Sequence, residues 1–366
     1  GAGSALRSRA RSSEGGTGFL IIGIDLAEVS SDNFRPISGV PCAGSNARAT
    51  DEATLLRVRR GRSKRMQSRR NIILGAGAAL LAPNAFAQAS ALQFLVVGDW
   101  GQASERQRQV ANAMASVAQS NATRFVISTG DNFYPSGVGS VNDPQFRRSF
   151  EDIYAAPALQ TPWYVVLGNH DYEGSPNAEI AYSSRSPRWR MPSRYWAEEM
   201  AVGAETATFY FLDTTPISRL SNAESHVPLL GAAGEAREQL QWFEQGLQAD
   251  RSAWKIVVGH HPIYSSGNHG ESPAVAERIR PLLETYGVQI YFNGHDHDLE
   301  HLVDRGVNYV CSGSGALARQ IETVPQSRFA YPNVGFASCA LGSDALALRF
   351  HDGDAAVIYE VQIARA

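Results

Sequence analysis

The sequence predicts an α/β fold in which buried strands alternate with helices, together with a second sheet that contains antiparallel strands. One observation is a series of nearly continuous apolar runs, each ending in a polar or glycine-containing turn, as strands covered on both faces do. These runs are residues 94–97, 125–128, 163–167, 209–212, 255–258 and 289–292. A second observation is the tail, where apolar and polar residues alternate from Ala345 to Val361 around a turn at Asp352-Gly353. That alternation is typical of an antiparallel hairpin.

Between the expected strands lie three segments whose apolar residues recur at helical spacing. Ser104 is suited to cap the first helix, because its hydroxyl can accept a hydrogen bond from a backbone N–H of the first turn. In the third segment Pro281 is expected to bend or divide the helix, since proline lacks a backbone N–H. The apolar faces are Val110, Met114 and Val117, then Leu240, Phe243 and Leu247, then Val275, Ile279 and Leu282. Strands interleaved with helices indicate a layered α/β domain.

Residues 1–87 are expected to lie outside this domain. Residues 1–65 lack sustained periodicity, which indicates a leader that is not part of the native protein. Residues 66–87 begin at the first methionine, Met66, and contain Arg69-Arg70, an apolar run at 72–82 and the cleavage pattern Ala85-Phe86-Ala87. This order is typical of a cleavable export signal, of the twin-arginine kind or, as the alternative, an ordinary Sec signal.

These features predict a periplasmic or secreted protein whose folded domain occupies residues 88–366. No stable membrane anchor is expected, because spanning a bilayer takes about 20 apolar residues. The net charge of −3 and the pI near 6.3 give no clustered basic excess, so nucleic acid is not an expected partner. A monomer is expected. Three cysteines are too few for a disulfide scaffold, and a Cys311–Cys339 bridge is not expected.

Five polar clusters each follow one of the apolar runs. Because ligands of open α/β sheets bind at the carboxyl ends of the strands, we expect the clusters to converge at that edge of one sheet. Their donors are carboxylate, imidazole, amide and phenolate without thiolate, a set that favours iron, zinc or manganese. Seven donors are too many for one tetrahedral site and indicate a pair of ions with a bridging carboxylate. The clusters are Gly98-Asp99-Trp100-Gly101, Gly130-Asp131-Asn132-Phe133-Tyr134, Gly168-Asn169-His170-Asp171, Gly259-His260-His261-Pro262 and Gly294-His295-Asp296-His297.

The order of these motifs resembles the calcineurin-like metallophosphoesterase superfamily, and specifically the purple, tartrate-resistant acid phosphatases. Asp99-Trp100 in place of the Asp-x-His form, and Tyr134 three residues after Asp131, separate that family from its relatives. The resemblance covers the whole domain. It implies a four-layer α-β-β-α sandwich of two mixed β-sheets flanked by helices, and a hydrolase of the acid phosphatase type.

The resemblance also implies the role of each donor. It implies a ferric ion bound by Asp99, Asp131, Tyr134 and His297, and a second ion, Fe(II), Zn or Mn, bound by Asp131, Asn169, His260 and His295. His170 and His269 match two family histidines that contact the substrate and assist the leaving group. Residues 189–192 fall where the family carries a loop over the site. The sequence departs from mammalian members at Asp298, where asparagine is usual, and at residues 311–315.

The chemistry expected from this set is hydrolysis of phosphomonoesters, either small molecules or phosphopeptides, by attack of a metal-bound hydroxide. An acid pH optimum is expected, because a histidine can hold the leaving group's proton at acid pH. One alternative is a metallophosphodiesterase of the same fold, since the two-metal core is shared. Another is a protein that binds metals or phosphate without turnover. Against the second, every expected metal position is filled.

Other polar residues near the motifs are expected to support the donors. His261 is expected to pack against them or to hydrogen-bond beside them, and Asp171 and Asp296 to orient imidazoles. His226, His301 and His351 lie outside the clusters and are expected to be solvated or core histidines.

Overall fold

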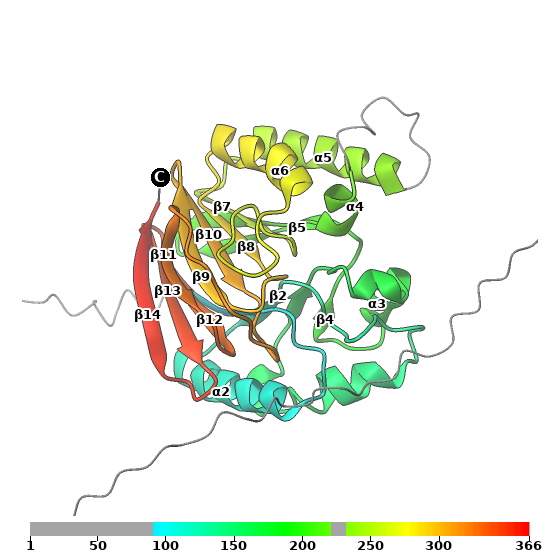
Figure 1. Cartoon of the computed structure of the whole chain (residues 1–366). Helices are drawn as coiled ribbons and strands as arrows, with labels where there is room; N and C mark the ends of the chain where they lie inside the picture. Colours follow the sequence, from blue (N-terminus) through cyan, green and yellow to red (C-terminus); the bar gives the residue numbers. More distant parts are fainter. Residues whose placement is uncertain (1–90, 221–231, 366) are drawn as a thin grey trace, which may run out of the picture. The chain divides into compact units, whose positions relative to one another are not determined.

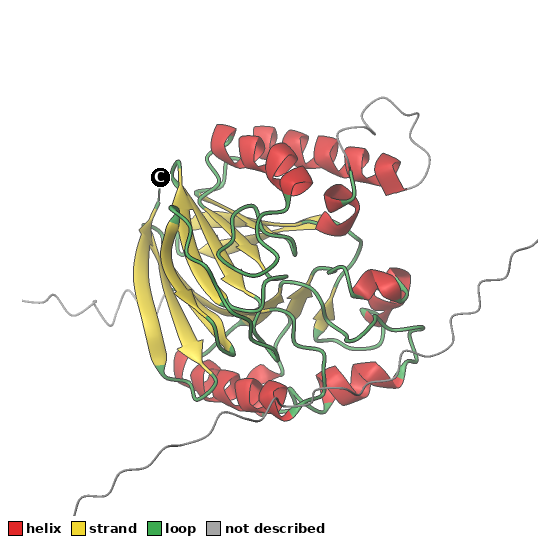
Figure 2. Cartoon of the chain, viewed as in Figure 1, coloured by secondary structure: helices red, strands yellow, loops and turns green. Residues whose placement is uncertain are grey.

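Two mixed β-sheets pack face to face, and helices cover the outer face of each (Figures 1 and 2). The computed structural model describes residues 91–220 and 232–365, which belong to one compact unit. The expected leader and export signal, residues 1–87, lie outside the described residues, and so do Cys42 and His226. The layers follow the order helix, sheet, sheet, helix, which confirms the expected four-layer sandwich.

The first sheet has seven strands in the order β14-β13-β12-β1-β2-β3-β4. Strands β1 to β4 are parallel, and β12, β13 and β14 extend the sheet with antiparallel pairs. The pair β13 and β14 confirms the hairpin predicted from the tail. The bounds are β1 (Leu92–Val97), β2 (Phe125–Ser128), β3 (Trp163–Val165), β4 (Trp189–Arg190), β12 (Gly335–Leu341), β13 (Ala345–Asp352) and β14 (Val357–Ala364).

The second sheet also has seven strands, in the order β11-β9-β10-β8-β7-β6-β5. Its centre, from β6 through β7 and β8 to β10, is parallel, whereas β5, β9 and β11 pair in the antiparallel sense. The bounds are β5 (Trp196–Val202), β6 (Glu205–Phe211), β7 (Trp254–Val258), β8 (Ile290–Asn293), β9 (Leu299–Asp304), β10 (Val307–Ser312) and β11 (Ser327–Tyr331).

Strand β1 shows why the predicted strands are almost wholly apolar. Leu95 and Val97 face outward into the core under α2, whereas Phe94 and Val96 face the core between the two sheets. Because both faces of the strand are buried, the sequence does not alternate with polar residues. A third core lies between the second sheet and helices α5 and α6. The helices are α2 (Glu105–Asn121), α3 (Pro176–Tyr182), α4 (Thr214–Ser218), α5 (Ala232–Ala249) and α6 (Pro273–Thr285), with a π-helical turn at Phe146–Glu151 and 3-10 turns at Pro157–Leu159 and Asp171–Glu173.

Two local expectations differ from the structure. Helix α6 continues through Pro281, so the proline does not divide it, and the expected bend stays a prediction. Residues 189–190 form the edge strand β4 instead of a loop over the site. The physical reason is burial: Trp189 is fully buried and packs against Phe133 and Phe150, which anchors this segment in the core.

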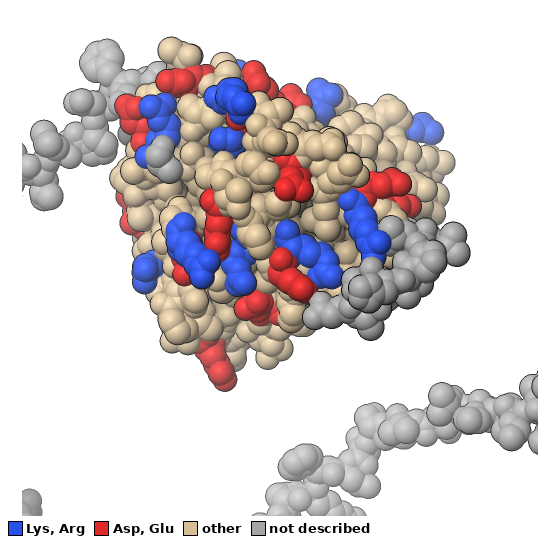
Figure 3. Space-filling model, turned by 90° about the horizontal axis from the view of Figure 1, so that it is seen from above, with Lys and Arg blue, Asp and Glu red and all other residues tan. Residues whose placement is uncertain are grey.

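The described residues include no helix that is long and apolar enough to cross a membrane. Cys311 and Cys339 are buried free thiols, so the expectation that they are unbridged is confirmed. On the face that carries α5 and α6, basic and acidic side chains of the described residues are interspersed (Figure 3). Pairs such as Arg305–Glu284, at 3.1 Å, neutralise charge locally on the surface. The expectation that nucleic acid is not a partner stays a prediction.

Helix α2 provides a test of the fold. The Ser104 hydroxyl accepts a hydrogen bond from the backbone N–H of Gln107 at 3.2 Å, as predicted for a helix cap. Ser104→Ala removes this acceptor, and we expect the free energy of unfolding to fall by about 1 kcal/mol. Ser120→Ala, near the other end of the same helix, is the matched control, because the Ser120 hydroxyl only donates to the Ser116 carbonyl. Urea unfolding followed by circular dichroism measures both, and equal stabilities for the two variants would contradict the capping role.

Candidate metal centre

The expected donors follow strand ends in both sheets. Asp99 follows β1, Asp131 and Tyr134 follow β2, and Asn169 follows β3, all in the first sheet; His260 follows β7, and His295 and His297 follow β8, in the second. The expectation that the motifs meet at the edge of one sheet is therefore wrong. Sheet membership depends on pairings between strands far apart in sequence, such as β1 with β12 and β8 with β10, and local sequence does not encode these pairings. The loops from the two sheets nevertheless meet at one end of the sandwich.

One group of donor atoms surrounds the hydroxyl of Tyr134. This hydroxyl lies 2.9 Å from Asp131 Oδ2, 3.1 Å from Asp99 Oδ1 and 3.2 Å from His297 Nε2. His297 Nε2 also lies 3.5 Å from Asp99 Oδ1. The four side chains that the resemblance groups around a ferric ion are thus brought together.

A second group surrounds the amide oxygen of Asn169. Asn169 Oδ1 lies 2.9 Å from His295 Nδ1 and 3.1 Å from His260 Nε2. His260 Nε2 lies 3.4 Å from Asp131 Oδ1, the other oxygen of the carboxylate that faces Tyr134. Asp131 therefore presents one oxygen to each group, which is the geometry of a bridging ligand.

The backbone is strained where it presents these donors. Asp99, Asp131 and His295 have φ angles of 56°, 51° and 72°, in the left-handed region that costs non-glycine residues on the order of 1 kcal/mol or more. Gly168 allows the close approach, because a Cβ there would lie 2.1 Å from Asp131 Oδ1. Such strain persists only where surrounding structure determines it, and it concentrates at functional sites.

The charges of the donor side chains are those expected at a site that binds cations. Burial, and then the charge of Asp131, raise the pKa of Asp99 well above its usual value. Burial, and then the Arg319 guanidinium, lower the pKa of His297 to about 3, so its imidazole is neutral and one ring nitrogen has a lone pair that can bind a metal. Within the described residues the ion-pair partners of Asp99 and Asp131 are only His297 and His260. Asp99, Asp131 and His260 offer donor atoms within 4.8 Å of one another, and a metal ion would supply the missing positive charge.

The two histidines expected at the substrate lie on the rim of this group. The ring of His269 packs against the ring of His295 at 4.5 Å, and the ring of His170 lies 4.6 Å from that of Tyr134. His170 Nδ1 lies 2.5 Å from the Pro135 carbonyl, which can only accept, so Nδ1 carries the proton. Tyr134, Asn169 and His295 are partly exposed, so the centre is open to a ligand on the side of these histidines.

The aspartates beside the donors accept hydrogen bonds from backbone N–H groups and from the side chains of Asn132 and Ser265, and not from imidazoles as expected. Asp171 accepts hydrogen bonds from the backbone N–H groups of Asn132, Phe133 and Gly168. Asp296 accepts one from the N–H of His269 at 2.7 Å. The reason is that turns expose N–H groups that only a nearby acceptor can satisfy once they are buried. Both carboxylates therefore hold loops in place.

Two residues outside the motifs also contact the centre. The Thr214 hydroxyl accepts hydrogen bonds from the backbone N–H of His260 and of His261, and lies 2.9 Å from His261 Nδ1, which confirms the supporting role of His261. The sequence does carry a signal for Thr214, because it closely follows the apolar run 209–212, as the donors follow the other apolar runs. The Arg319 guanidinium contacts His269 Nε2, and no sequence pattern marks that residue.

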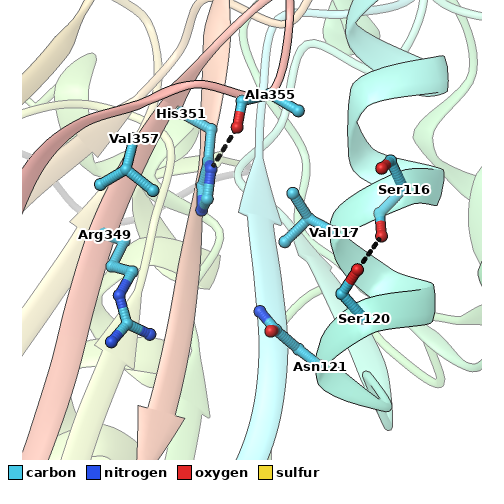
Figure 4. Close-up of a pocket in the computed structure, with 8 residues that line it drawn as sticks. All are labelled: Ser116, Val117, Ser120, Asn121, Arg349, His351, Ala355 and Val357. Carbon is cyan, nitrogen blue, oxygen red and sulfur yellow. Dashed lines mark hydrogen bonds between the residues drawn. The ribbon is translucent and has the colours of Figure 1, made fainter.

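The remaining histidines of the described residues are structural, as expected. His301 lies 2.9 Å from the Tyr359 hydroxyl and 3.0 Å from Asn308 Oδ1. His351 lies on the wall of a cavity of about 390 Å³ between α2 and the β13–β14 hairpin, which Ser116, Asn121 and Arg349 also line (Figure 4). Its ring nitrogens face the Ser338 hydroxyl and the Ala355 carbonyl. Neither histidine approaches the donor groups in these contacts.

The sequence matches the calcineurin-like phosphoesterase family over residues 92–299. Purple acid phosphatase 3 of Arabidopsis thaliana is 38% identical over 277 residues, which cover 71% of this chain and 74% of that protein. Tartrate-resistant acid phosphatase type 5 of Rattus norvegicus is 36% identical over 301 residues, which cover 76% of this chain and 92% of that protein.

Solved structures have the same fold. The GAP50 anchor in the inner membrane complex of Plasmodium is 26% identical, with a TM-score of 0.68 over 75% of this chain and 89% of that one. A purple acid phosphatase from seeds of yellow lupin, Lupinus luteus, is 17% identical, with a TM-score of 0.58 over 75% of this chain and 54% of that one. The family match and the curated relatives confirm the resemblance predicted from the five motifs: the chain belongs to the calcineurin-like phosphoesterases, a family of hydrolases, and within them to the purple, tartrate-resistant acid phosphatases.

Proposed function

We propose that the chain is an exported acid phosphatase that hydrolyses phosphomonoesters at a dinuclear metal centre. The observation that carries this proposal is the division of seven donor side chains into two groups that share Asp131, whose oxygens lie 2.9 Å from the Tyr134 hydroxyl and 3.4 Å from His260 Nε2. These residues would hold two ions, with Asp131 as the ligand common to both. Export is supported by the signal pattern of residues 66–87, and the substrates would be small phosphomonoesters or phosphopeptides.

The donor chemistry favours different ions at the two positions. Asp99, Asp131, Tyr134 and His297 would hold Fe(III), because a phenolate and two carboxylates suit a hard trivalent ion, and Asp131, Asn169, His260 and His295 would hold Fe(II), Zn or Mn. When bound, the ions supply a hydroxide nucleophile at acid pH and neutralise the charge of the phosphoryl group.

The chain itself positions the substrate and handles the leaving group's proton. His170 keeps its Nδ1 proton on the Pro135 carbonyl, which leaves Nε2 to face a ligand. Asp296 holds the backbone of His269, so that this ring stays packed on His295 at the open side of the centre. Once both of its ring nitrogens are protonated, either histidine could donate a proton to the leaving oxygen as its bond to phosphorus breaks.

Removing one donor tests the centre. His260→Ala takes a buried imidazole from the second group, and we expect kcat/KM for p-nitrophenyl phosphate to fall by at least about 100-fold. Metal analysis should find about one bound ion in place of two. His351→Ala, which removes a buried histidine outside the centre, is the control and should keep both metals and activity. Unchanged phosphatase activity in His260→Ala would refute the assignment.

The identity of the first ion has a spectroscopic test. A phenolate bound to Fe(III) gives a visible charge-transfer band that zinc or manganese cannot produce, so the purified protein should be purple. Tyr134→Phe removes the phenolate and should abolish the band while the iron content stays measurable. A colourless protein with two divalent ions would show that Tyr134 does not bind ferric iron, and the ratio of p-nitrophenyl phosphate to bis(p-nitrophenyl) phosphate hydrolysis would then decide between monoesterase and diesterase.

The buried carboxylates predict how pH affects the metal-free protein. Burial raises the pKa of Asp99 above its unfolded value of about 3.9, so the folded state favours the protonated form. In chelator, the stability that Asp99 contributes should therefore be greatest below about pH 3.9 and should be lost as the pH rises and Asp99 must ionise. Asp99→Asn removes that charge and should stabilise the metal-free protein by about 1–2 kcal/mol at pH 7. The exposed Asp344→Asn is the control; thermal unfolding of all three proteins measures the effect, and a less stable Asp99→Asn protein in chelator would contradict it.

A further inference from the structure

Glu179, on helix α3, is a fully buried acidic side chain in contact with the loop that follows β2. Its Oε2 accepts a hydrogen bond from the Asn132 amide at 3.1 Å, whereas Oε1 accepts none from the described residues. No basic side chain in the described part of the chain lies within ion-pair distance of Glu179. Because a buried carboxylate with one hydrogen bond and no cation is costly as an anion, Glu179 favours its neutral form.

A second buried carboxyl group, that of Asp171, lies beside Glu179. The Asn132 amide nitrogen that donates to Glu179 also donates to Asp171 Oδ2 at 3.1 Å, so the two carboxyl groups flank one donor. Glu179 and Asp171 also lie within hydrogen-bond reach of each other. Because carboxylates only accept, that contact is a hydrogen bond only if one of the two groups is protonated. Burial, and then the charge of Asp171, raise the pKa of Glu179 well above its usual value, which agrees with a proton in this pair.

The hydrogen bonds that Asp171 accepts place this proton on Glu179. Asp171 accepts from three backbone N–H groups, those of Asn132 at 2.9 Å, Phe133 at 3.2 Å and Gly168 at 2.8 Å. Burial, and then the charge of Asp131, raise the pKa of Asp171 to about 8, but these three N–H groups oppose the rise. Glu179 accepts no backbone hydrogen bond from the residues that the structure describes. Since such hydrogen bonds favour the charged form, Glu179 is the donor of the pair and Asp171 the acceptor.

We propose that Glu179 is a positioning residue of the metal centre that acts as a neutral carboxylic acid, donating to Asp171 and accepting from Asn132. The proposal rests on the proposed function, because it takes the loops after β2 and β3 as carriers of metal ligands. Asp171 binds the backbone N–H groups that directly follow Asp131 and directly precede Asn169, two of the expected ligands. The proton on Glu179 removes the repulsion between the two buried carboxyl groups and adds a hydrogen bond that holds Asp171. Glu179 therefore acts on the ligands through Asp171.

The test compares two variants of similar side-chain length in the metal-loaded protein. Glu179→Gln keeps one acceptor and one donor, as in the neutral acid, so kcat/KM for p-nitrophenyl phosphate should stay within about threefold of wild type. Glu179→Met has neither group, and kcat should fall by about 10- to 100-fold with little change in KM, while a chelator should remove the metals more readily. Glu173→Met replaces an exposed acid on the preceding 3-10 turn and should alter neither kcat nor metal retention.

The proton on Glu179 has a spectroscopic readout that needs no turnover. In the infrared difference spectrum between wild type and Glu179→Gln, the band that disappears should be the C=O stretch of a protonated carboxylic acid. Loss of carboxylate bands instead, an inactive but folded Glu179→Gln, or a fully active Glu179→Met would each overturn the proposal.

Two further outcomes are kept apart from these. If circular dichroism shows that Glu179→Met does not fold, the activity of Glu179→Gln and the infrared band decide the question. A wild-type protein that binds both ions but hydrolyses no phosphomonoester would refute the proposed function alone, and metal retention and the infrared band would then still test Glu179. A wild-type protein that binds no metal would overturn both.

Discussion

The carboxylate of Asp131 faces both groups of donors, and much of the surrounding structure serves to hold it there. Its residue adopts a φ of 51°, a conformation that aspartate rarely takes without external support. The backbone N–H of His170 donates to its Oδ1 at 2.9 Å, and Gly168 leaves the space that this oxygen occupies. The Asp171 carboxylate in turn accepts hydrogen bonds from backbone N–H groups in the loops that follow β2 and β3. The position of the two Asp131 carboxylate oxygens thus depends on two neighbouring loops of the first sheet, those after β2 and β3.

The distance from Asp131 to the histidines of the second sheet is set by the core between the sheets. Phe94 of β1 makes edge contacts with Phe209 of β6 and Phe292 of β8, with ring centroids 5.7 and 6.2 Å apart. Aromatic edge contacts have restricted geometry, and each adds about 0.5–1.5 kcal/mol beyond the area it buries. Packing between two sheets, and not pairing within one, therefore fixes the spacing of the metal centre.

This division explains what the sequence could predict. The six strands at 94–97 to 289–292 and the five polar clusters after them follow from local signals, since an apolar run and the polar residue after it are neighbours in the chain. The role of each donor within these clusters rests on the family resemblance. The first three strands and the strands β7 and β8 belong to separate sheets because of how they pair. Strand β1 pairs with β12, and β8 pairs with β10, and neither pairing can be seen in the local sequence. The irregular segment that carries Arg319 has neither periodicity nor a motif. The motif marks Asp171 as a supporting residue, but its hydrogen-bond partners depend on which backbone N–H groups the turns leave unpaired. The sequence does not show these groups.

Charge links the stability of the domain to its ligands. Asp99 is completely buried beside Asp131, and within the described residues no basic side chain other than histidine pairs with either carboxylate. Folding without metal therefore buries acidic groups that must be protonated or remain uncompensated, which weakens the metal-free state. A bound ion stabilises the folded chain in proportion to the logarithm of its concentration over its dissociation constant. The left-handed backbone at Asp99, Asp131 and His295 raises the free energy of the folded state. Because the same three residues are expected metal ligands, metal binding would offset this cost.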